Sequence, residues 1–330
     1  MYWLKRLPID TFLLSIITTI IIATIIPCEG EAKAVFKNLT TAAIALLFFM
    51  HGAKLSRSAL LQGIRHWRLH IAVFSSTFIL FPILGIFMGF LEPTILSPEV
   101  YLGFLFLCAL PGTVQAAIAF TSVAGGNVPA AICSSSASSI LGVFLSPLLV
   151  GLLMHTQGIS NNTLDAIYKI ILQLMVPFLI GHLSRSLIGQ WIDEHKKWIG
   201  RVDQSSILLV LYTAFSEAVV EGIWHKVTAG SLIAIFVCSA ILLAIVMTIN
   251  IFVARRLKFN LRDEITLIFC GSKKSLVNGI PMANVLFPAS VVGVMVLPLM
   301  VFHQIQLIVC AIMAQRYAKL TAKLDQDDAS

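Results

Sequence analysis

The chain has 330 residues, of which 58% are hydrophobic and only 12% are charged, and its formal net charge is +7. Soluble domains contain roughly 25% charged residues, whereas the apolar runs of this chain are about 20 residues long, enough to cross a hydrocarbon core of about 30 Å. The composition therefore excludes an ordinary soluble protein and predicts an all-α polytopic membrane protein. The basic residues are spread through short loops and form no basic tail or patch interleaved with aromatic residues, so no nucleic-acid partner is expected.

Ten transmembrane helices are predicted from the apolar runs. The first run lacks a cleavage site made of small residues, so we interpret it as a retained span and not as a signal peptide. The spans lie near residues 11–27, 38–54, 69–91, 101–124, 129–153, 164–184, 205–224, 229–253, 264–288 and 290–314.

The distribution of lysine and arginine predicts the orientation of these spans, because short cytoplasmic loops of membrane proteins are rich in both residues. With ten spans, 17 of the 23 basic residues fall on one side of the membrane and 4 on the other. Both termini are therefore expected in the cytoplasm. The four basic residues on the opposite side are Lys33, Lys37, Lys169 and Lys226.

The ten spans divide into two groups of five, residues 1–160 and 161–330. Because each group has an odd number of spans, the two halves have opposite orientations, and such inverted repeats are typical of transporters. Span 4 reads FLFLCALPGTVQAAIAFTSVAGGN and span 9 reads TLIFCGSKKSLVNGIPMANVLFP. Both begin with an apolar run that ends in cysteine, and both are then interrupted by helix-breaking residues.

These breaking residues are Pro111 and Gly112 in span 4, and Gly271, Gly279 and Pro281 in span 9. Proline removes a backbone donor and clashes with the preceding turn, and glycine tolerates the resulting conformation. A kinked but continuous helix is the alternative for either span taken alone. The matched positions in the two halves favour two discontinuous helices that cross in the middle of the membrane.

Two adjacent lysines, Lys273 and Lys274, lie between the apolar runs of span 9. Ionisable residues inside spans mark substrate or ion pathways by default, and the N-termini of half-helices add positive partial charge. We therefore expect the two lysines to form the positively charged lining of a binding site that faces an internal cavity. The alternative is a shorter span that lets both side chains reach the membrane interface.

The segments LPGTVQAAIAFTSVAGGNVPAAICSSSASSILGVFLSPLLVGLL and CGSKKSLVNGIPMANVLFP resemble the bile acid:sodium symporter (SBF-like) superfamily, in particular its bacterial symporter-like branch. The resemblance covers essentially the whole chain. It implies a panel domain made of spans 1, 2, 6 and 7 and a core domain made of spans 3–5 and 8–10, in which spans 4 and 9 cross. It also implies a substrate bound between core and panel, alternating access by movement of the core, and a bacterial inner-membrane location.

The sequence departs from the sodium-coupled members of this superfamily, in which serine and asparagine of span 4 and glutamate and glutamine of span 9 ligate two sodium ions. The span 4 positions are here Gln115, Ala116 and Ala117, and the span 9 positions are about Ser272 and Leu276. Alanine and leucine offer no side-chain oxygen to a hard cation. A nearby ammonium also repels sodium, so we expect the lysines to carry permanently the charge that sodium brings elsewhere.

Other polar residues near the breaks are further candidates. Ser135, in the serine-rich span 5, aligns with a family sodium ligand, although serines also allow close helix contacts. The remaining candidates could bind substrate or ions, or could cap backbone groups freed by the breaks. They are Thr113, Gln115, Ser275, Asn278 and Asn284.

Glu217 is the most informative acidic residue, because span 7 places it about two-thirds of the way across, followed by Glu221 and His225. It could balance a core lysine or carry a proton; alternatively, span 7 ends early and both glutamates line the outer mouth. The isolated His51, His182 and His303 show no metal-ligand spacing, so we expect core histidines and not metal ligands. No metal, catalytic residue or cofactor is expected, apart from sodium or a proton as the coupling ion.

The residues favour a secondary active transporter of an amphipathic organic anion, either bile-acid-like or another carboxylate, coupled to sodium or protons. A cation/proton exchanger is one alternative, and a non-transporting regulatory membrane protein is another. An enzyme is not expected, because no catalytic dyad, nucleophile elbow, metal motif or phosphate-binding loop appears. The expected partners are a small organic anion and the lipid bilayer.

Overall fold

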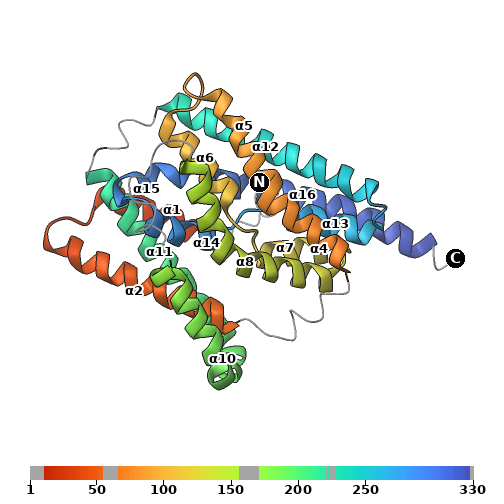
Figure 1. Cartoon of the computed structure of the whole chain (residues 1–330), viewed down its shortest axis with the longest axis horizontal. Helices are drawn as coiled ribbons and strands as arrows, with labels where there is room; N and C mark the ends of the chain where they lie inside the picture. The colour runs from red at the N-terminus through yellow and green to blue at the C-terminus, as the bar shows by residue number, and fades with distance from the viewer. Residues whose placement is uncertain (1–10, 55–65, 156–170, 221, 223–227, 328–330) are drawn as a thin grey trace, which may run out of the picture. The chain divides into compact units, whose positions relative to one another are not determined.

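The computed structural model describes residues 11–54, 66–155, 171–220, 222 and 228–327, and these residues form helices without a single strand (Figure 1). They belong to two compact units. The first unit comprises Met1–Lys54, Lys169–Lys226 and Ile280–Val294. The second comprises Leu55–Tyr168, Val227–Gly279 and Met295–Ser330.

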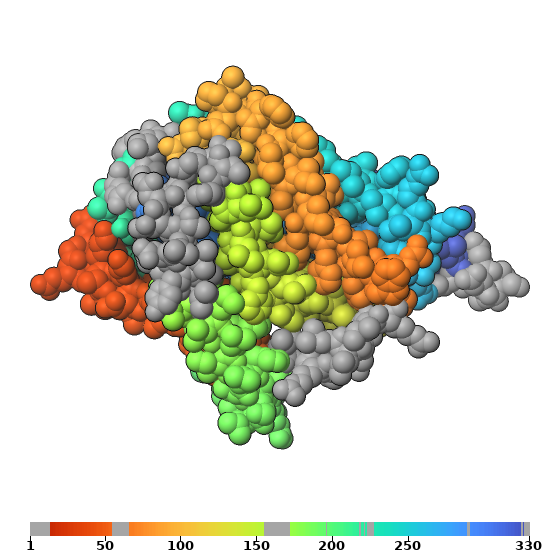
Figure 2. Space-filling model, viewed as in Figure 1, coloured from red at the N-terminus to blue at the C-terminus, as the bar shows by residue number. Residues whose placement is uncertain are grey.

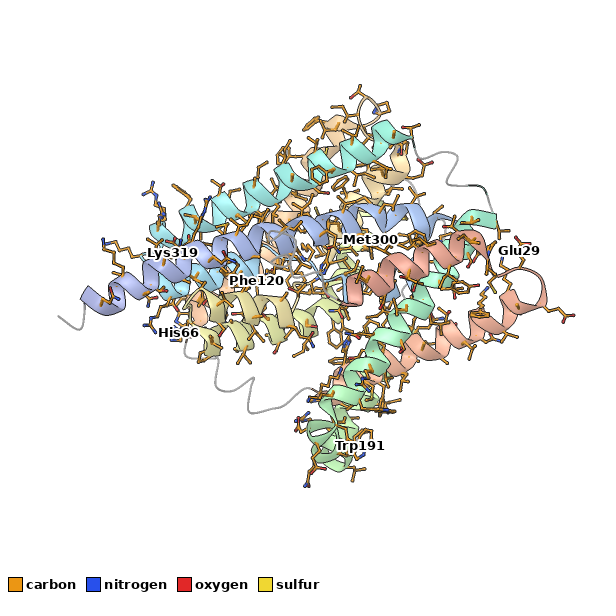
Figure 3. The ribbon with its side chains drawn as sticks, turned by 180° about the vertical axis from the view of Figure 1, so that it is seen from behind. Glu29, His66, Phe120, Trp191, Met300 and Lys319 are labelled. Atoms are coloured by element: carbon orange, nitrogen blue, oxygen red, sulfur yellow. The ribbon has the colours of Figure 1, made fainter. Side chains whose placement is uncertain are left out.

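The first unit is a bundle in which α1 packs on α11, α11 on α2, and α2 on α10. Its helices are α1 (Thr11–Ile25), α2 (Glu31–Lys54), the π-helical turn η5 (Ile171–Met175), α10 (Val176–Glu194), α11 (Lys196–Val220) and α15 (Ala289–Met295). Glu29, in the turn before α2, and Trp191, near the end of α10, lie at opposite ends of this unit (Figure 3).

The contact between α2 and α10 depends on two glycines. A Cβ atom on Gly52 would overlap the carbonyl oxygen of Phe178, and a Cβ atom on Gly181 would overlap the carbonyl oxygen of Phe49. The backbones of the two helices therefore approach so closely that no side chain fits between them, as is common where membrane helices pack through small residues.

Replacing Gly181 with alanine is expected to lower the apparent melting temperature of the purified protein. The added methyl group meets backbone, which cannot rotate away, and such overpacking typically costs about 1–3 kcal/mol. Gly200→Ala is the matched control, because nothing lies within 4 Å of a Cβ atom there, and alanine favours a helix more than glycine does. Equal melting temperatures for the two variants would contradict the close contact.

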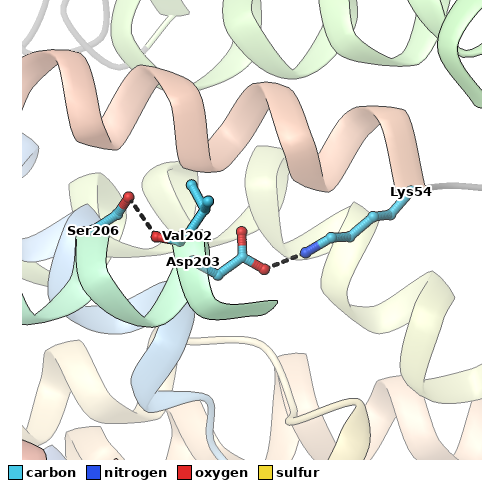
Figure 4. A network of polar contacts seen from close by, with 4 residues as sticks. All are labelled: Lys54, Val202, Asp203 and Ser206. Carbon is cyan, nitrogen blue, oxygen red and sulfur yellow. Dashed lines mark hydrogen bonds and ion pairs between the residues drawn. The ribbon is translucent and has the colours of Figure 1, made fainter. Parts of the chain in front are cut away.

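Polar contacts join the C-terminal end of α2 to α10 and to the N-terminal part of α11. Lys54 forms an ion pair with Asp203, while the Ser206 hydroxyl donates to the carbonyl oxygen of Val202 one turn away (Figure 4). The Arg185 guanidinium donates to the carbonyl oxygen of Ala53 over 2.6 Å. These bonds satisfy carbonyl and carboxylate oxygens where the helices end.

The second unit is assembled around small residues. Ala117, Ala130, Ala131 and Ala254 are buried where α4, α7, α8, α12 and α13 meet, and they allow these helices to approach one another. Its elements are α4 (Trp67–Ser75), the π-helical turn η3 (Ser76–Leu80), α5 (Phe81–Phe87), the 3-10 turn η4 (Met88–Leu91), α6 (Pro98–Ala109), α7 (Gln115–Val123), α8 (Val128–His155), α12 (Ala229–Arg256), α13 (Leu261–Gly271), α14 (Leu276–Leu286) and α16 (Leu297–Asp327). Of these, α14 carries the chain into the first unit.

Within the described residues, six helices are long and apolar enough to cross a membrane. Figure 2 shows α4, α5 and α8 on one face of the second unit, and these helices expose apolar side chains such as Ile71, Ile83 and Leu148, as expected for contact with lipid. The six helices are Glu31–Lys54, Trp67–Leu91, Val128–Met154, Leu172–Glu194, Ala229–Arg256 and Val291–Leu324, and the shorter apolar helices are Leu14–Ile25 and Pro98–Ala109. The count of ten spans and their inverted repeat stay predictions.

Spans 4 and 9 are both interrupted. The chain leaves the helix between Ala109 and Gln115, and again between Gly271 and Leu276. The expected break at Gly279 and Pro281 does not occur, because α14 continues through both residues to Leu286.

Gly279 instead allows Leu110 and Leu299 to pack closely against α14. A Cβ atom there would lie 2.6 Å from Leu110 Cδ1 and would also overlap Leu299. Pro281 deprives α14 of one backbone bond, which a membrane helix tolerates when it is covered by neighbouring protein.

Candidate functional site

The two helix breaks lie side by side in the second unit. The Ser275 backbone N–H donates to the carbonyl oxygen of Pro111 over 2.9 Å. A Cβ atom on Gly112 would lie 3.3 Å from the carbonyl oxygen of Cys270, and one on Gly142 would overlap the Pro111 ring. Glycines therefore allow the two irregular segments to contact each other and α8, and this contact forms the candidate site.

Lys274 fills the centre of this contact. Its ammonium donates to the carbonyl oxygens of Thr77, Cys108 and Leu110 over 2.9, 2.9 and 2.6 Å, and it lies 4.1 Å from the centre of the Phe81 ring. The side chain has no exposed surface. Because an ammonium has three donors, every donor of Lys274 is used by the protein itself.

Two prolines explain why the carbonyl oxygens of Thr77 and Cys108 are available. In the π-helical turn η3, the Phe81 N–H donates to the carbonyl oxygen of Ser76, five residues back. In the same pattern the carbonyl oxygen of Thr77 would accept from the N–H of residue 82, but residue 82 is proline and has no N–H. The carbonyl oxygen of Cys108 also lacks a helical donor. Residue 111, three positions later, is proline and has no N–H, and the N–H of Gly112, four positions later, donates to Ser138 over 3.3 Å. Lys274 thus satisfies acceptors that the backbone cannot.

The backbone of Lys274 is held by Gln306 of α16, which is fully buried. The Gln306 side-chain oxygen accepts from Lys274 N–H over 2.9 Å, and its side-chain nitrogen donates to the Lys274 carbonyl oxygen over 3.0 Å. His303 Nδ1 lies 2.8 Å from the same nitrogen. Gln306 is not among the site residues predicted from the sequence, although a glutamine one turn after a histidine in an apolar span is a signal for a buried polar contact.

Replacing Gln306 with leucine is expected to destabilise the protein by about 2–3 kcal/mol, because it leaves the N–H and carbonyl of Lys274 buried without partners. Thermal unfolding of the purified protein measures this. Gln306→Glu is the second variant. It keeps an acceptor for the Lys274 N–H but removes the donor to the Lys274 carbonyl oxygen, so its unfolding temperature should lie between those of Gln306→Leu and the wild type. A leucine variant as stable as the wild type would show that the paired bonds contribute nothing.

Lys273 occupies a different environment, although it is also fully buried. Its ammonium donates to the carbonyl oxygen of Ala116 over 2.9 Å and lies 3.9 Å and 5.5 Å from the ring centres of Phe120 and Phe269. Cation–π contacts of this kind stabilise an ammonium without using all of its N–H donors. Lys273 is therefore less completely bonded than Lys274.

The two lysines do not reach a membrane interface, since their side chains have no exposed surface. The shorter-span alternative is therefore wrong. They also differ from the expected open lining of a cavity, because carbonyl oxygens and aromatic rings pack against both ammonium groups. The physical reason is that the breaks supply backbone acceptors close enough to enclose each charge.

Serines of α8 bond to groups around the breaks. Ser135 Oγ lies 3.4 Å from the Cys270 sulfur, and Ser138 accepts from Gly112. Ser139 accepts from the Asn278 side chain over 3.2 Å. These contacts are of the kind expected where serines join closely packed helices.

The other expected site residues lie in varied surroundings. Ser275 Oγ accepts from Asn278 N–H over 3.2 Å and so caps α14, whereas the buried Thr113 hydroxyl has no hydrogen-bond partner within the described residues. Gln115 is exposed at the start of α7. Asn284 donates to the carbonyl oxygen of Ile280 one turn back, in the first unit.

Glu217 lies in the first unit and forms an ion pair with Lys33 over 3.1 Å. Both residues line a pocket of about 230 Å³ beside the turn that joins α1 to α2. Since α11 ends at Val220, Glu217 is close to a helix end, and its position at an outer mouth stays a prediction. Glu221 and His225 lie outside the described residues.

Comparison with known proteins identifies the family. Residues 10–319 match the SBF-like CPA transporter family. The chain belongs to this family. A protein of Escherichia coli strain K12 named "Putative symporter YfeH" is 62% identical over 322 residues, which cover 98% of this chain and 97% of that protein.

Vertebrate relatives are more distant members. "Sodium/bile acid cotransporter 7-B" of Xenopus laevis is 27% identical over 317 residues, covering 94% of this chain and 92% of that protein. "Sodium/bile acid cotransporter 7" of Rattus norvegicus is also 27% identical over 317 residues, covering 94% and 93%. Membership of the SBF-like CPA family, together with the apolar helices, makes this chain an integral membrane protein of a transporter family, and such a protein acts on a small molecule.

Proposed function

We propose that this protein is a secondary active transporter of an amphipathic organic anion, bile-acid-like or another carboxylate, that works by alternating access. The relatives named as symporters and as sodium/bile acid cotransporters support a symport activity. The two adjacent helix breaks in one unit support a transport site, since irregular backbone at membrane depth is kept where it serves such a site.

We further propose the ten-helix architecture with inverted repeats at 1–160 and 161–330. The division into two units supports it, because the first unit holds α1, α2, α10 and α11, which correspond to the panel spans 1, 2, 6 and 7. The second unit holds the helices that correspond to the core spans, apart from Ile280–Val294 of spans 9 and 10, which belong to the first unit. The basic residues near the ends of α2, α10 and α11 support cytoplasmic termini and an inner-membrane location.

The coupling mechanism rests on the observation that Lys274 donates to three backbone carbonyl oxygens. Oxygens are the ligands that hard cations prefer, so in our proposal the Lys274 ammonium permanently holds the place of a coupling cation. Lys273, with a single hydrogen bond to carbonyl, is then the group that meets the substrate anion. Under this scheme sodium is not required, and a proton gradient is the expected driving force.

Uptake and counterflow of taurocholate in proteoliposomes test this function, with a sodium gradient and a pH gradient imposed separately. The expected result is saturable counterflow, with uptake driven by the pH gradient alone. Uptake driven by sodium would keep the transporter but overturn the replacement of sodium by Lys274. The absence of counterflow for taurocholate and for other amphipathic carboxylates would favour a regulatory membrane protein.

The cation/proton exchanger alternative requires a carboxylate that carries the proton, and Glu217 was its candidate. The ion pair between Glu217 and Lys33 at the end of α11 does not favour this role. Proton movement that needs Glu217 but no organic anion would support the exchanger instead.

A further inference from the structure

The helix α16 is longer than a membrane span requires. Its 31 residues extend over about 46 Å at 1.5 Å per residue, compared with about 30 Å for a hydrocarbon core. The stretch from Leu297 to Gln315 contains no lysine, arginine, aspartate or glutamate, and Arg316 is the first such residue. The segment Arg316–Asp327 therefore continues beyond the apolar part of the helix.

One side of this segment is fixed to the second unit. The Tyr317 hydroxyl donates to Glu264 of α13 over 2.9 Å, and the same carboxylate lies 3.5 Å from the Arg255 guanidinium of α12. Thr321 donates to the carbonyl oxygen of Ala124, after α7, over 3.2 Å. The end of α12, the start of α13 and the turn of α16 at residues 317–321 are thus at one level, and the apolar parts of α12 and α16 stop there.

The other side of the segment is exposed and both basic and apolar. Arg316, Lys319 and Lys323 are three, four and seven positions apart, so they share one face of the helix. Leu320 and Leu324 are 53% and 46% exposed beside them. Lys319 lies on the outer side of α16 (Figure 3).

The neighbouring helix ends add more exposed cations. Among the acidic residues nearest in sequence, Asp263 and Glu264 are buried and bonded to Asn127 and Tyr317, so they contribute little exposed negative charge. Asp325 and Asp327 follow Lys323 at the end of α16 and offset part of the positive charge there. We call the whole surface the basic patch. It consists of Arg255, Arg256, Lys258, Arg262, Arg316, Lys319 and Lys323.

We propose that the basic patch binds the headgroups of anionic phospholipids in the leaflet at the C-terminal end of α16. Clusters of four to eight basic residues next to a membrane helix attract anionic lipid, with about 1 kcal/mol for each residue near the surface. The position of the patch, where the apolar part of α12 and of α16 ends, places it at headgroup level. The exposed leucines suit the apolar edge of a lipid better than a dissolved anion.

The test compares the apparent melting temperature of the full-length protein in uncharged detergent, at low salt, with phosphatidylglycerol or with phosphatidylcholine at equal mole fraction. Phosphatidylglycerol should raise the melting temperature by several degrees and phosphatidylcholine should not. The rise should fall by about half or more in Lys319→Gln/Lys323→Gln, and it should weaken at high salt because exposed charges are screened. Both lysines are exposed, so the double variant is expected to fold.

The control variant is Lys197→Gln/Arg201→Gln, which removes the same charge from exposed positions of the first unit and should keep the full rise. An equal loss in both double variants would overturn the proposal, since the effect would then depend on net charge alone. An unchanged rise in Lys319→Gln/Lys323→Gln would also overturn it. Glycerol phosphate in place of the lipid should have no effect; an equal rise would assign the patch to free phosphate groups instead.

Discussion

The Lys274→Met protein is expected to accumulate poorly and to unfold at a much lower temperature than the wild type. Methionine keeps the approximate length of the side chain but leaves the carbonyl oxygens of Thr77, Cys108 and Leu110 without a donor. Each unsatisfied buried acceptor costs about 1–3 kcal/mol. The sum is comparable with the whole stability of many proteins, which is about 5–15 kcal/mol.

Fluorescence-detected gel filtration of the expressed protein and thermal unfolding measure this loss. Lys273→Met is the matched control, because the neighbouring lysine is equally buried but makes one hydrogen bond to a carbonyl oxygen. If the Lys274 variant were as stable as the wild type, the three bonds would not hold the two breaks together, and Lys274 would be free for a transport role.

Lys273→Met is expected to reduce anion transport about 10- to 100-fold while the protein still folds, because a hydrogen bond between a charged donor and a bound anion contributes about 1.5–3 kcal/mol. Folding should survive, since this variant loses one hydrogen bond to a carbonyl oxygen and two ring contacts, whereas Lys274→Met loses three such hydrogen bonds. Counterflow of taurocholate, or of any anion that the wild type exchanges, provides the measurement.

Lys273→Arg separates charge from shape in the same assay. It keeps the positive charge, but a planar guanidinium does not reproduce the compact ammonium between Phe120 and Phe269. Partial transport is therefore expected. Wild-type rates in Lys273→Met would remove this residue from the substrate site, and would leave the proposed transport activity to be carried by other groups.

The sequence predicted the class of the protein well, because hydrophobic runs of spanning length leave few alternatives in a membrane. It also placed an interruption at Pro111 and Gly112, where two helix-breaking residues are adjacent. It predicted breaks in span 9 both at Gly271 and at the Gly279–Pro281 segment, and only the first of these occurs. A proline or glycine only weakens a helix locally, and whether the helix continues depends on what packs against it, here Leu110 and Leu299 against Gly279.

The sequence by itself determined the all-helical membrane character, the family and the presence of two charges inside an apolar span. Only the tertiary structure decided which groups those charges contact. The acceptors of Lys274 come from Thr77 and from Cys108 and Leu110, and Gln306 holds its backbone from another helix. These groups are far from Lys274 in sequence. A hydrophobic pattern does not indicate which carbonyl oxygen lacks a backbone donor because of a proline. The partners of a buried charge are therefore fixed by how the helices pack together.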